Sequence, residues 1–185
     1  MTIKTIITEP NEILRQVSKP VQTVGNEERK LMDDMLETMY AANGIGLAAI
    51  QIGIPKRIIV MDISKDGKKN PMYFVNPTIK NKDKEKTTYE EGCLSVPNYF
   101  AEVDRPKYCE VEYLDYNGEN KILEADGLLA TCIQHEMDHL EGILFIDYLS
   151  KLKKTMIVKK LSKRKNPPDS CLLYTSDAAD ELVGV

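Results

Sequence analysis

The sequence lacks the features that mark membrane and exported proteins. No apolar run approaches the roughly 18 to 20 residues that a helix needs to cross a bilayer, and residues 1–10 have no apolar core of the kind found in signal peptides. The formal net charge of −4 is small for 185 residues, so bulk charge predicts no polyanionic partner. These absences argue against a membrane-spanning helix and favour a cytoplasmic location, with neither membrane nor DNA as a partner.

Cysteine is scarce as well. The chain has four cysteines, Cys93, Cys109, Cys132 and Cys171, which could in principle form two disulfides. Without an export signal a reducing compartment is the better expectation, and cysteines there more often serve metal binding or catalysis. We therefore treat each cysteine as a free thiol.

Length and composition predict one folded domain. A domain usually contains roughly 100 to 200 residues, and 42% hydrophobic with 29% charged residues is the balance of a soluble globular protein. Residues 151–165 hold seven Lys and one Arg without an acid, whereas residues 166–185 hold four acids without Lys or Arg. Because Pro167 and Pro168 break the helical pattern between the two regions, we expect the domain to occupy residues 1–165.

Three segments have helical periodicity. Asn26 can cap a helix over residues 27–43, whose apolar side chains recur at helical spacing. Asp126 can cap a second helix that ends near Gly142. Residues 148–164 predict a third, amphipathic helix with a lysine-rich face.

Short runs of β-branched and aromatic residues between turn residues predict strands. They occupy residues 57–63, 72–78 and 108–114. The dipeptide Asn117-Gly118 supplies the positive φ angles of a tight turn, which predicts an antiparallel pair between residues 108–114 and 122–123. The chain contains no internal repeat.

The only two histidines of the chain, His135 and His139, stand four residues apart on the second predicted helix. Four helical residues rotate by about 400°, so both imidazoles face the same way at about 6 Å along the axis and can share one metal ion. Glu136 is turned away by about 100°, which suits contact with a metal-bound water better than coordination. The alternative, a solvated helix face with two incidental histidines, is less favoured for this motif.

A catalytic site of this kind usually takes three protein ligands and leaves one position for water. Cys132 lies on the same helical stripe, but about 10 Å from His139 along the axis. Ligands of one ion lie within about 4 Å of each other, so we interpret Cys132 as a buried side chain. Asp138 faces away from the stripe. The third ligand must therefore come from another part of the chain.

Two other segments are unusual. Cys93 follows a glycine and precedes Pro97, although a single cysteine is more often a buried thiol than a ligand. Residues 44–51 contain two glycines that permit close backbone approach, and Gln51 offers an amide donor in an apolar stretch. Neither segment by itself indicates a function.

Taken together, residues 44–51, 91–95 and 134–142 resemble, in this order, the three signature motifs of peptide deformylases. The resemblance extends from about Ile7 to about Lys160. It implies an α+β fold in which antiparallel sheets enclose a central helix with the His-Glu-x-x-His motif, followed by a C-terminal amphipathic helix. It also implies one divalent metal ion, usually Fe(II), which zinc or nickel can replace.

The resemblance further implies that the chain removes the formyl group from formyl-methionyl nascent peptides and releases formate. It assigns metal binding to Cys93, His135 and His139. Glu136 would act as general base toward the metal-bound water and then as general acid. The backbone N–H of Leu94 and the side-chain amide of Gln51 would stabilise the oxyanion. The residues implied around the substrate are Ile45, Gly46, Tyr89, Leu128, Thr131 and Cys132.

This sequence departs from the family pattern at two of these positions and at one further position near the substrate entrance. Tyr89 and Thr131 stand where aliphatic residues are frequent, and Phe100 stands where many bacterial relatives carry Arg. The last twenty residues match nothing in the family, and residues 170–180 look like translated foreign or vector-derived sequence. We therefore expect residues 1–165 to form the catalytic domain.

Two other kinds of protein could carry this histidine motif. A zinc endopeptidase shares the His-Glu-x-x-His motif, but it takes its third ligand from a downstream Glu, His or Asp, and no His follows His139. A structural metal module would need a fourth ligand such as Cys109 or Cys132. Related bacterial enzymes use a C-terminal extension to dock near the ribosomal exit tunnel, and this resemblance makes the ribosome one candidate partner of the lysine-rich helix. The alternative is a lysine face that only keeps the helix soluble.

Overall fold

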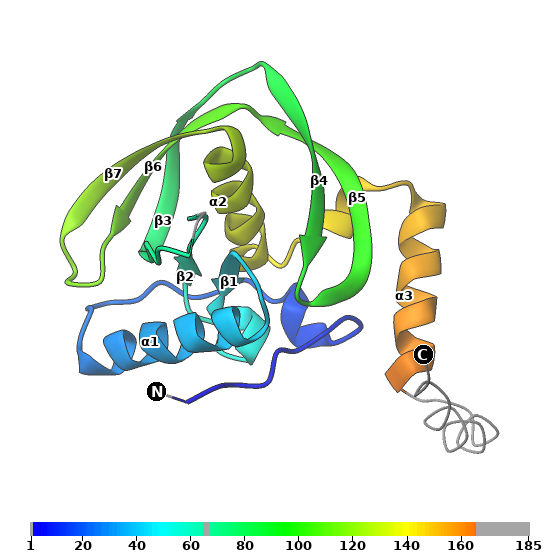
Figure 1. The fold of residues 1–185 in the computed structure, drawn as a ribbon, viewed down its shortest axis with the longest axis horizontal. Coiled ribbons are helices and arrows are strands. Elements are labelled where there is room, and N and C mark those ends of the chain that lie inside the picture. The colour runs from blue at the N-terminus through cyan, green and yellow to red at the C-terminus, as the bar shows by residue number, and fades with distance from the viewer. Residues whose placement is uncertain (1, 65–66, 166–185) are drawn as a thin grey trace, which may run out of the picture.

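Seven β-strands and three α-helices make up the part of the chain that the computed structural model describes, residues 2–64 and 67–165 (Figure 1). The α+β class is therefore as predicted. The helices are α1 (Asn26–Ala41), α2 (Gly127–Leu140) and α3 (Lys151–Lys165), with 3-10 helices η1 (Glu12–Arg15), η2 (Ala49–Ile52) and η3 (Phe145–Tyr148). The strands are β1 (Gly46–Ala48), β2 (Ile58–Met61), β3 (Met72–Lys82), β4 (Lys86–Cys93), β5 (Val96–Pro106), β6 (Tyr108–Leu114) and β7 (Asn120–Asp126).

The strands form two antiparallel sheets. One has five strands in the order β1-β2-β3-β6-β7. The other is the β4–β5 hairpin, which lies between β3 and β6 in the sequence. Strands β6 and β7 pair from Tyr108 opposite Asp126 to Leu114 opposite Asn120, around a turn in which Gly118 has a φ of 80°. The predicted antiparallel pair is confirmed, but only Gly118, and not Asn117, has the positive φ expected of the turn.

Strand β2 is buried on both faces, which explains its uninterrupted apolar run. Ile58 and Val60 pack with α1 in one hydrophobic cluster, whereas Ile59 and Met61 pack with α2 in another. A third cluster joins β5 to η3 and α3. In Figure 1, α2 lies between β3, β6 and β7 on one side and the β4–β5 hairpin on the other, and α3 lies beyond β5.

Two of the three helix starts differ from the prediction. Asn26 is the first residue of α1, and Gly25 takes the cap position because Glu28 reaches back to accept its backbone N–H at 3.0 Å. Asp126 does occupy the N-cap of α2, but its side chain makes no capping hydrogen bond. The third helix starts later than predicted, because Phe145–Tyr148 forms a separate 3-10 helix. Strands β1, β4 and β5 were not predicted.

Cys93, Cys109 and Cys132 are free thiols, as predicted. Cys171 and the whole tail of residues 166–185 lie outside the described residues. Within residues 2–64 and 67–165, no helix has the length and apolar character needed to span a bilayer.

Candidate metal centre and substrate pocket

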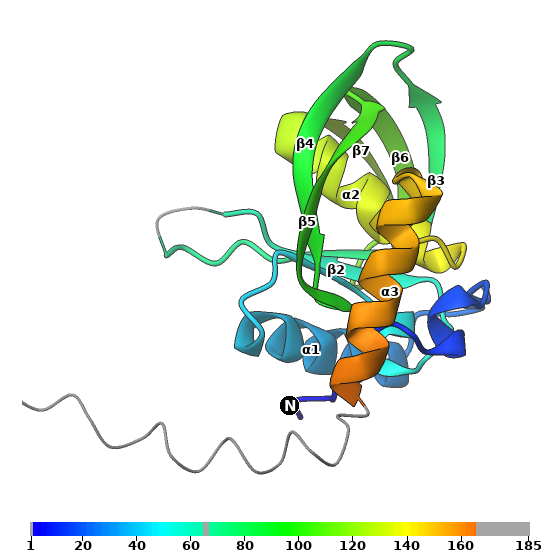
Figure 2. The same cartoon turned by 90° about the vertical axis from the view of Figure 1, so that its right-hand side faces the viewer.

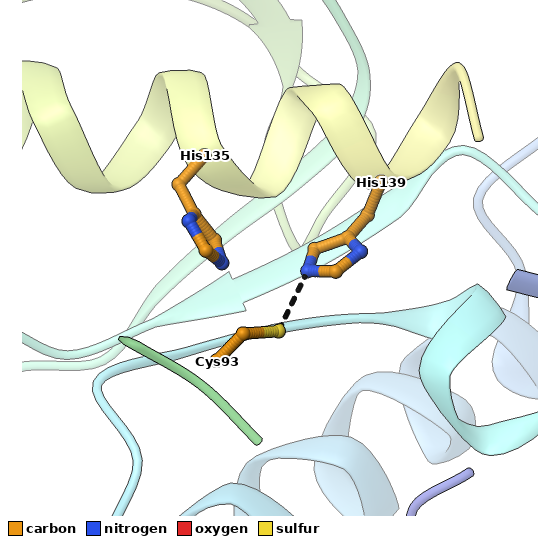
Figure 3. A group of neighbouring side chains, drawn as sticks. All are labelled: Cys93, His135 and His139. Carbon is orange, nitrogen blue, oxygen red and sulfur yellow. Dashed lines mark hydrogen bonds between the residues drawn. The ribbon is translucent and has the colours of Figure 1, made fainter. Parts of the chain in front are cut away.

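Three side chains from two elements meet beside α2 (Figure 3). His135 and His139 project from the helix with ring centroids 5.1 Å apart, and Cys93 comes from the end of β4. One ligand atom from each of the three lies within 4.8 Å of the other two. The Cys93 Sγ is 3.3 Å from His139 Nε2. Within the described part of the chain, no other group of three His, Cys, Asp or Glu residues meets this criterion for a metal site.

Local structure brings the cysteine to the helix. Cys93 pairs with Val96 at the closed end of the β4–β5 hairpin, and the strand register shifts between Gly92 and Cys93. Such a shift re-aims a strand residue, and here the thiol turns toward the histidines. Hairpin and helix contact each other. The site therefore depends on how β4 packs against α2 as well as on helix spacing.

The donor set fits a divalent transition-metal ion. A thiolate with two imidazoles suits zinc, iron or nickel, whereas calcium and magnesium prefer oxygen ligands. The Nδ1 of His135 lies 2.8 Å from Glu91 Oε2, and an Nδ1–H that donates to this carboxylate leaves Nε2 with its lone pair for a metal. Both imidazoles are buried, so the surrounding side chains restrict their orientations.

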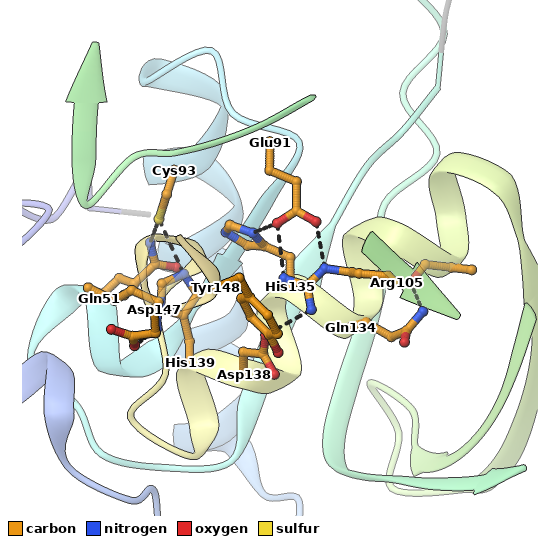
Figure 4. Close-up of polar contacts among 12 residues, drawn as sticks. Gln51, Glu91, Cys93, Arg105, Gln134, His135, Asp138, His139, Asp147 and Tyr148 are labelled. Carbon is orange, nitrogen blue, oxygen red and sulfur yellow. Dashed lines mark hydrogen bonds and ion pairs between the residues drawn. The ribbon is translucent and has the colours of Figure 1, made fainter. Parts of the chain in front are cut away.

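A buried polar network holds Glu91 in place (Figure 4). Arg105 on β5 donates to both oxygens of Glu91, at 2.5 and 2.9 Å, and to Asp138 Oδ2 at 2.8 Å. The hydroxyl of Tyr148 donates to the same Asp138 oxygen at 2.8 Å. Burial alone would raise the pKa of Glu91, but the hydrogen bonds from His135 and Arg105 outweigh it and lower this pKa. The network therefore keeps Glu91 as an anion that orients His135.

Sequence reasoning missed both Glu91 and Arg105. A signal for Glu91 was present, because it is the first residue of segment 91–95, which resembles one of the three family motifs. No local pattern marks Arg105. It reaches Glu91 only because β5 folds back along β4, where Thr87 lies opposite Arg105.

Glu136 lies beside the cluster with its carboxyl almost entirely buried. Its Oε2 has no hydrogen-bond partner among the described residues, and burial raises its pKa to about 7. A Cβ placed on Gly46 would lie 2.3 Å from Glu136 Oε1, so only glycine leaves room for this carboxyl. A carboxyl with a near-neutral pKa is well suited to take up and release a proton.

Gln51 presents its amide nitrogen to the same site. Its Oε1 accepts the backbone N–H of Ala48 at 2.8 Å, which fixes the orientation of the amide. Its Nε2 donates to Ser95 Oγ at 3.1 Å and lies 3.5 Å from Cys93 Sγ. An oriented N–H donor therefore stands next to the proposed sulfur ligand.

A cavity of about 500 Å³ opens onto these groups. Its wall contains all six residues that the sequence associates with substrate, together with Gln51, Leu94 and Glu136. Phe100 forms part of its rim with 66% of its surface exposed. The hydroxyl of Thr131 is buried without a hydrogen-bond partner among the described residues. The six residues are Ile45, Gly46, Tyr89, Leu128, Thr131 and Cys132.

The other two cysteines of the described chain stand apart from the cluster. Cys109 belongs to the hydrophobic core between the large sheet and α2, where burial raises its pKa to about 11. Cys132 is 6% exposed and its Sγ is 3.9 Å from the carbonyl oxygen of Ile45. Neither belongs to the metal-ligating group, so no four-ligand shell with either cysteine forms among the described residues.

Comparison with known proteins gives consistent results. The family model described as polypeptide deformylase matches residues 3–155. The chain is 75% identical to a peptide deformylase of Pelagibacter ubique (strain HTCC1062), over 90% of this chain and 97% of the relative. It is 57% identical to a peptide deformylase of Rhizobium meliloti (strain 1021), over 88% and 94% of the two chains. A crystal structure of peptide deformylase from Ehrlichia chaffeensis in complex with actinonin is similar with a TM-score of 0.86 at 44% identity, covering 91% of this chain and 100% of that one.

Proposed function

The chain belongs to the peptide deformylase family, and from this premise we propose how its residues remove the N-terminal formyl group of nascent peptides. Membership makes it a metallohydrolase that acts on formylated peptides. The assignment of roles is carried by one observation: ligand atoms of Cys93, His135 and His139 lie within 4.8 Å of one another. Glu136, a buried carboxyl without a partner for one oxygen, lines the adjoining cavity.

The three ligands would hold one divalent ion, with Fe(II) as the expected metal and zinc or nickel as substitutes. When bound, such an ion polarises the formyl carbonyl and lowers the pKa of a coordinated water toward neutrality. Glu91 keeps His135 in the tautomer that directs Nε2 at the site, since its Oε2 is 2.8 Å from Nδ1. In this arrangement α2 is the metal-bearing helix, and the two sheets enclose it.

Glu136 is proposed to carry the protons. Its carboxylate takes a proton from the attacking water, and the carboxylic acid then donates that proton to the departing amine of methionine. The pKa of about 7 allows both forms to be populated near neutral pH. As the formyl carbon becomes tetrahedral, the Gln51 amide and the Leu94 backbone N–H are the proposed donors to its oxyanion.

The cavity would hold the methionine side chain. Ile45, Leu128 and Cys132 supply apolar surface, and the Gly46 backbone stands beside Glu136 where the scissile amide must lie. The related enzyme from Ehrlichia chaffeensis forms a complex with actinonin. We expect the same cavity of this chain to bind that compound.

Formate release from formyl-Met-Ala-Ser by anaerobically purified protein tests the function, together with metal analysis of the same sample. We expect about one divalent ion per chain and release of formate. Cys93→Ala should lose both, because it removes one of three ligands. Cys109→Ala, which removes a buried thiol outside the site, is the matched control and should keep both. Absence of formate release from the fully metal-loaded protein would reject the proposed function.

We further propose that residues 1–165 form the catalytic domain, that the protein acts in the cytoplasm, and that α3 contacts the ribosome. Lys159, Lys160 and Lys163 are exposed on α3 and form no ion pair among the described residues. A surface of this kind attracts RNA phosphates. Contact near the exit tunnel would bring the active site to its nascent substrate, and salt-dependent co-sedimentation with ribosomes tests it.

A further inference from the structure

A second cavity, of about 480 Å³, lies between β5 and α3. Figures 1 and 2 show α3 alongside the β4–β5 hairpin, on the side of the hairpin away from α2. Part of the wall of this cavity belongs to the hydrophobic cluster beneath α3, including Tyr99, Ala101 and Ile157. Met156, which is 49% exposed, stands on the helix side. We call this cavity the β5–α3 groove.

The groove shares one lining side chain with the catalytic cavity. Phe100 lines both cavities and is 66% exposed. Its ring covers β4 at Gly92, where an added Cβ would lie 2.6 Å from a ring carbon. Since Gly92 immediately precedes Cys93, the Phe100 ring connects the surface next to the proposed metal ligand with the groove.

Strand β5 leaves one edge free along the groove. The hairpin sheet contains only β4 and β5, so among residues 2–64 and 67–165 no strand pairs with the second edge of β5. An edge strand presents backbone N–H and C=O groups to which an extended peptide can add. The groove thus offers backbone partners on one wall and an apolar surface on the other.

The charges at the groove favour an acidic occupant. Lys153 and Lys160 line it from α3, seven residues and therefore about 10 Å apart along one helix face. Neither lysine forms an ion pair with another described residue. Glu102 is the single acid of the lining. The groove therefore carries two cations against one anion.

We propose that the β5–α3 groove binds the downstream part of the formylated nascent peptide in an extended conformation, with a preference for acidic side chains. The inference rests on the proposed function, which supplies a substrate longer than the catalytic cavity. From that cavity the peptide crosses two strands spaced about 4.8 Å apart, and an extended chain advances about 3.3 Å per residue. About three residues cover the crossing, so roughly the fourth to seventh residues after the formyl group lie in the groove.

Three formyl-peptides test the proposal through their values of kcat/KM. One is formyl-Met-Ala-Ser, which ends before the groove. The other two are nonapeptides with the same start and either Glu or Lys at positions five to seven. In the unchanged protein, we expect the acidic nonapeptide to exceed the tripeptide by about tenfold, which corresponds to about 1.4 kcal/mol, and to exceed the basic nonapeptide.

Charge reversal on the groove face, Lys153→Glu with Lys160→Glu, should invert the order of the two nonapeptides. The matched control is Lys159→Glu with Lys163→Glu, which changes the net charge of α3 equally but outside the groove, and it should keep the original order. Equal kcat/KM for all three peptides would overturn the groove proposal, as would the same inversion in both double variants. Hydrolysis of the tripeptide distinguishes the groove proposal from the proposed function. If the tripeptide is not hydrolysed, the proposed function is rejected. If it is hydrolysed but the two nonapeptides have the same kcat/KM as the tripeptide, only the groove proposal is rejected.

Discussion

At the scale of single residues, Gly46 and Glu136 depend on each other. The space that a side chain at position 46 would need is occupied by the Glu136 carboxyl, which a Cβ would approach to 2.3 Å. A separation this short would force the carboxyl away from its buried position. The glycine at position 46 thus leaves the space that the Glu136 carboxyl occupies in this structure.

Glu136→Gln should separate catalysis from metal binding. The proposed proton carrier is lost while the three ligands remain, so turnover of formyl-Met-Ala-Ser should fall by roughly two to four orders of magnitude with the metal retained. Glu91→Gln is the contrasting variant, because Glu91 supports His135, and it should weaken metal binding by roughly 10- to 100-fold. Metal content and kcat are measured for both. Loss of metal from Glu136→Gln, or turnover equal to the unchanged protein, would contradict its role.

The environment of Asp62, away from the cluster of Cys93, His135 and His139, predicts that the stability of the protein depends on pH. Burial would raise its pKa, but hydrogen bonds from Ser64, Tyr40 and Asn70 prevail and lower the pKa from 3.8 to about 2. Because the folded pKa is the lower one, the stabilisation is complete above pH 4 and is lost as the pH falls toward 2. The shift corresponds to about 2 kcal/mol.

Asp62→Asn should therefore lower the free energy of unfolding by about 2 kcal/mol at pH 7, and this difference should shrink as urea unfolding is repeated down to pH 3. Asp126→Asn provides the matched control, since the exposed Asp126 side chain makes no capping hydrogen bond. A difference for Asp62→Asn that stayed constant over this pH range would show that its stabilisation is not electrostatic.

At the scale of secondary-structure elements, Arg105 joins three pieces of the fold. It links β5 to Glu91 on β4 and to Asp138 on α2, and it is 3% exposed. Removing one partner of a buried ion pair leaves the others uncompensated in a low-dielectric environment. The position of the hairpin relative to the face of α2 that carries His135 and His139 thus depends on one guanidinium.

Arg105→Met should lower the free energy of unfolding by roughly 3 to 5 kcal/mol. It should also weaken metal binding, because Glu91 loses the group that holds it against His135. Lys107→Met is the matched control near the same strand end, where an exposed pair with Glu85 should contribute little. Denaturation curves and metal titrations measure both effects, and coincident curves for Arg105→Met and the unchanged protein would refute the prediction.

The helices could be predicted from the sequence, whereas the hairpin could not. The sequences of α1, α2 and α3 show apolar residues at helical spacing because each helix buries one apolar stripe. In β4, the outward positions Lys86, Thr88 and Glu90 are exposed, and the inward positions Thr87 and Tyr89 are only partly buried. Both sets are largely polar. Residues of β4 therefore alternate in burial without alternating between apolar and polar types, and the sequence shows no strand pattern. The strand becomes visible only when β5 pairs with it.

Some of the proposed metal ligands could likewise be predicted from the sequence and one could not. The spacing of His135 and His139 follows from helix geometry and could be predicted locally. The approach of Cys93 to them is set by packing between β4 and α2, so only resemblance to a family pointed to it. Arg105 acts across a hairpin that the sequence did not reveal, and its role required the structure.

At the scale of the whole molecule, the β4–β5 hairpin separates two surfaces. One side faces α2 and carries Cys93 at its closed end, and the other side faces α3. The lysines of α3 divide accordingly: Lys153 and Lys160 line the groove, whereas Lys163 lies outside it. In these proposals a nascent chain and a ribosome share Lys160 but otherwise use different lysines of the same helix.

The ribosome proposal predicts a binding that depends on α3 and not on the catalytic centre. Cutting the chain after Lys165 should preserve turnover of formyl-Met-Ala-Ser, since the family match ends at residue 155. It should preserve or strengthen ribosome binding, because it removes four acids that follow the basic run in the sequence. The truncated protein is therefore the reference for the lysine variants.

In that reference, changing Lys159, Lys160 and Lys163 to Ala should weaken co-sedimentation with ribosomes and leave formate release unaltered. Each phosphate contact releases condensed counterions, so binding by the unchanged helix should fall steeply with salt, and the triple variant should show a shallower dependence. The matched control changes three exposed lysines near the β3–β4 turn to Ala and should bind like the reference. Equal sedimentation of both triple variants at every salt concentration would contradict ribosome binding by α3. The α3 lysines would then serve only to keep the surface soluble. The control lysines are Lys82, Lys84 and Lys86.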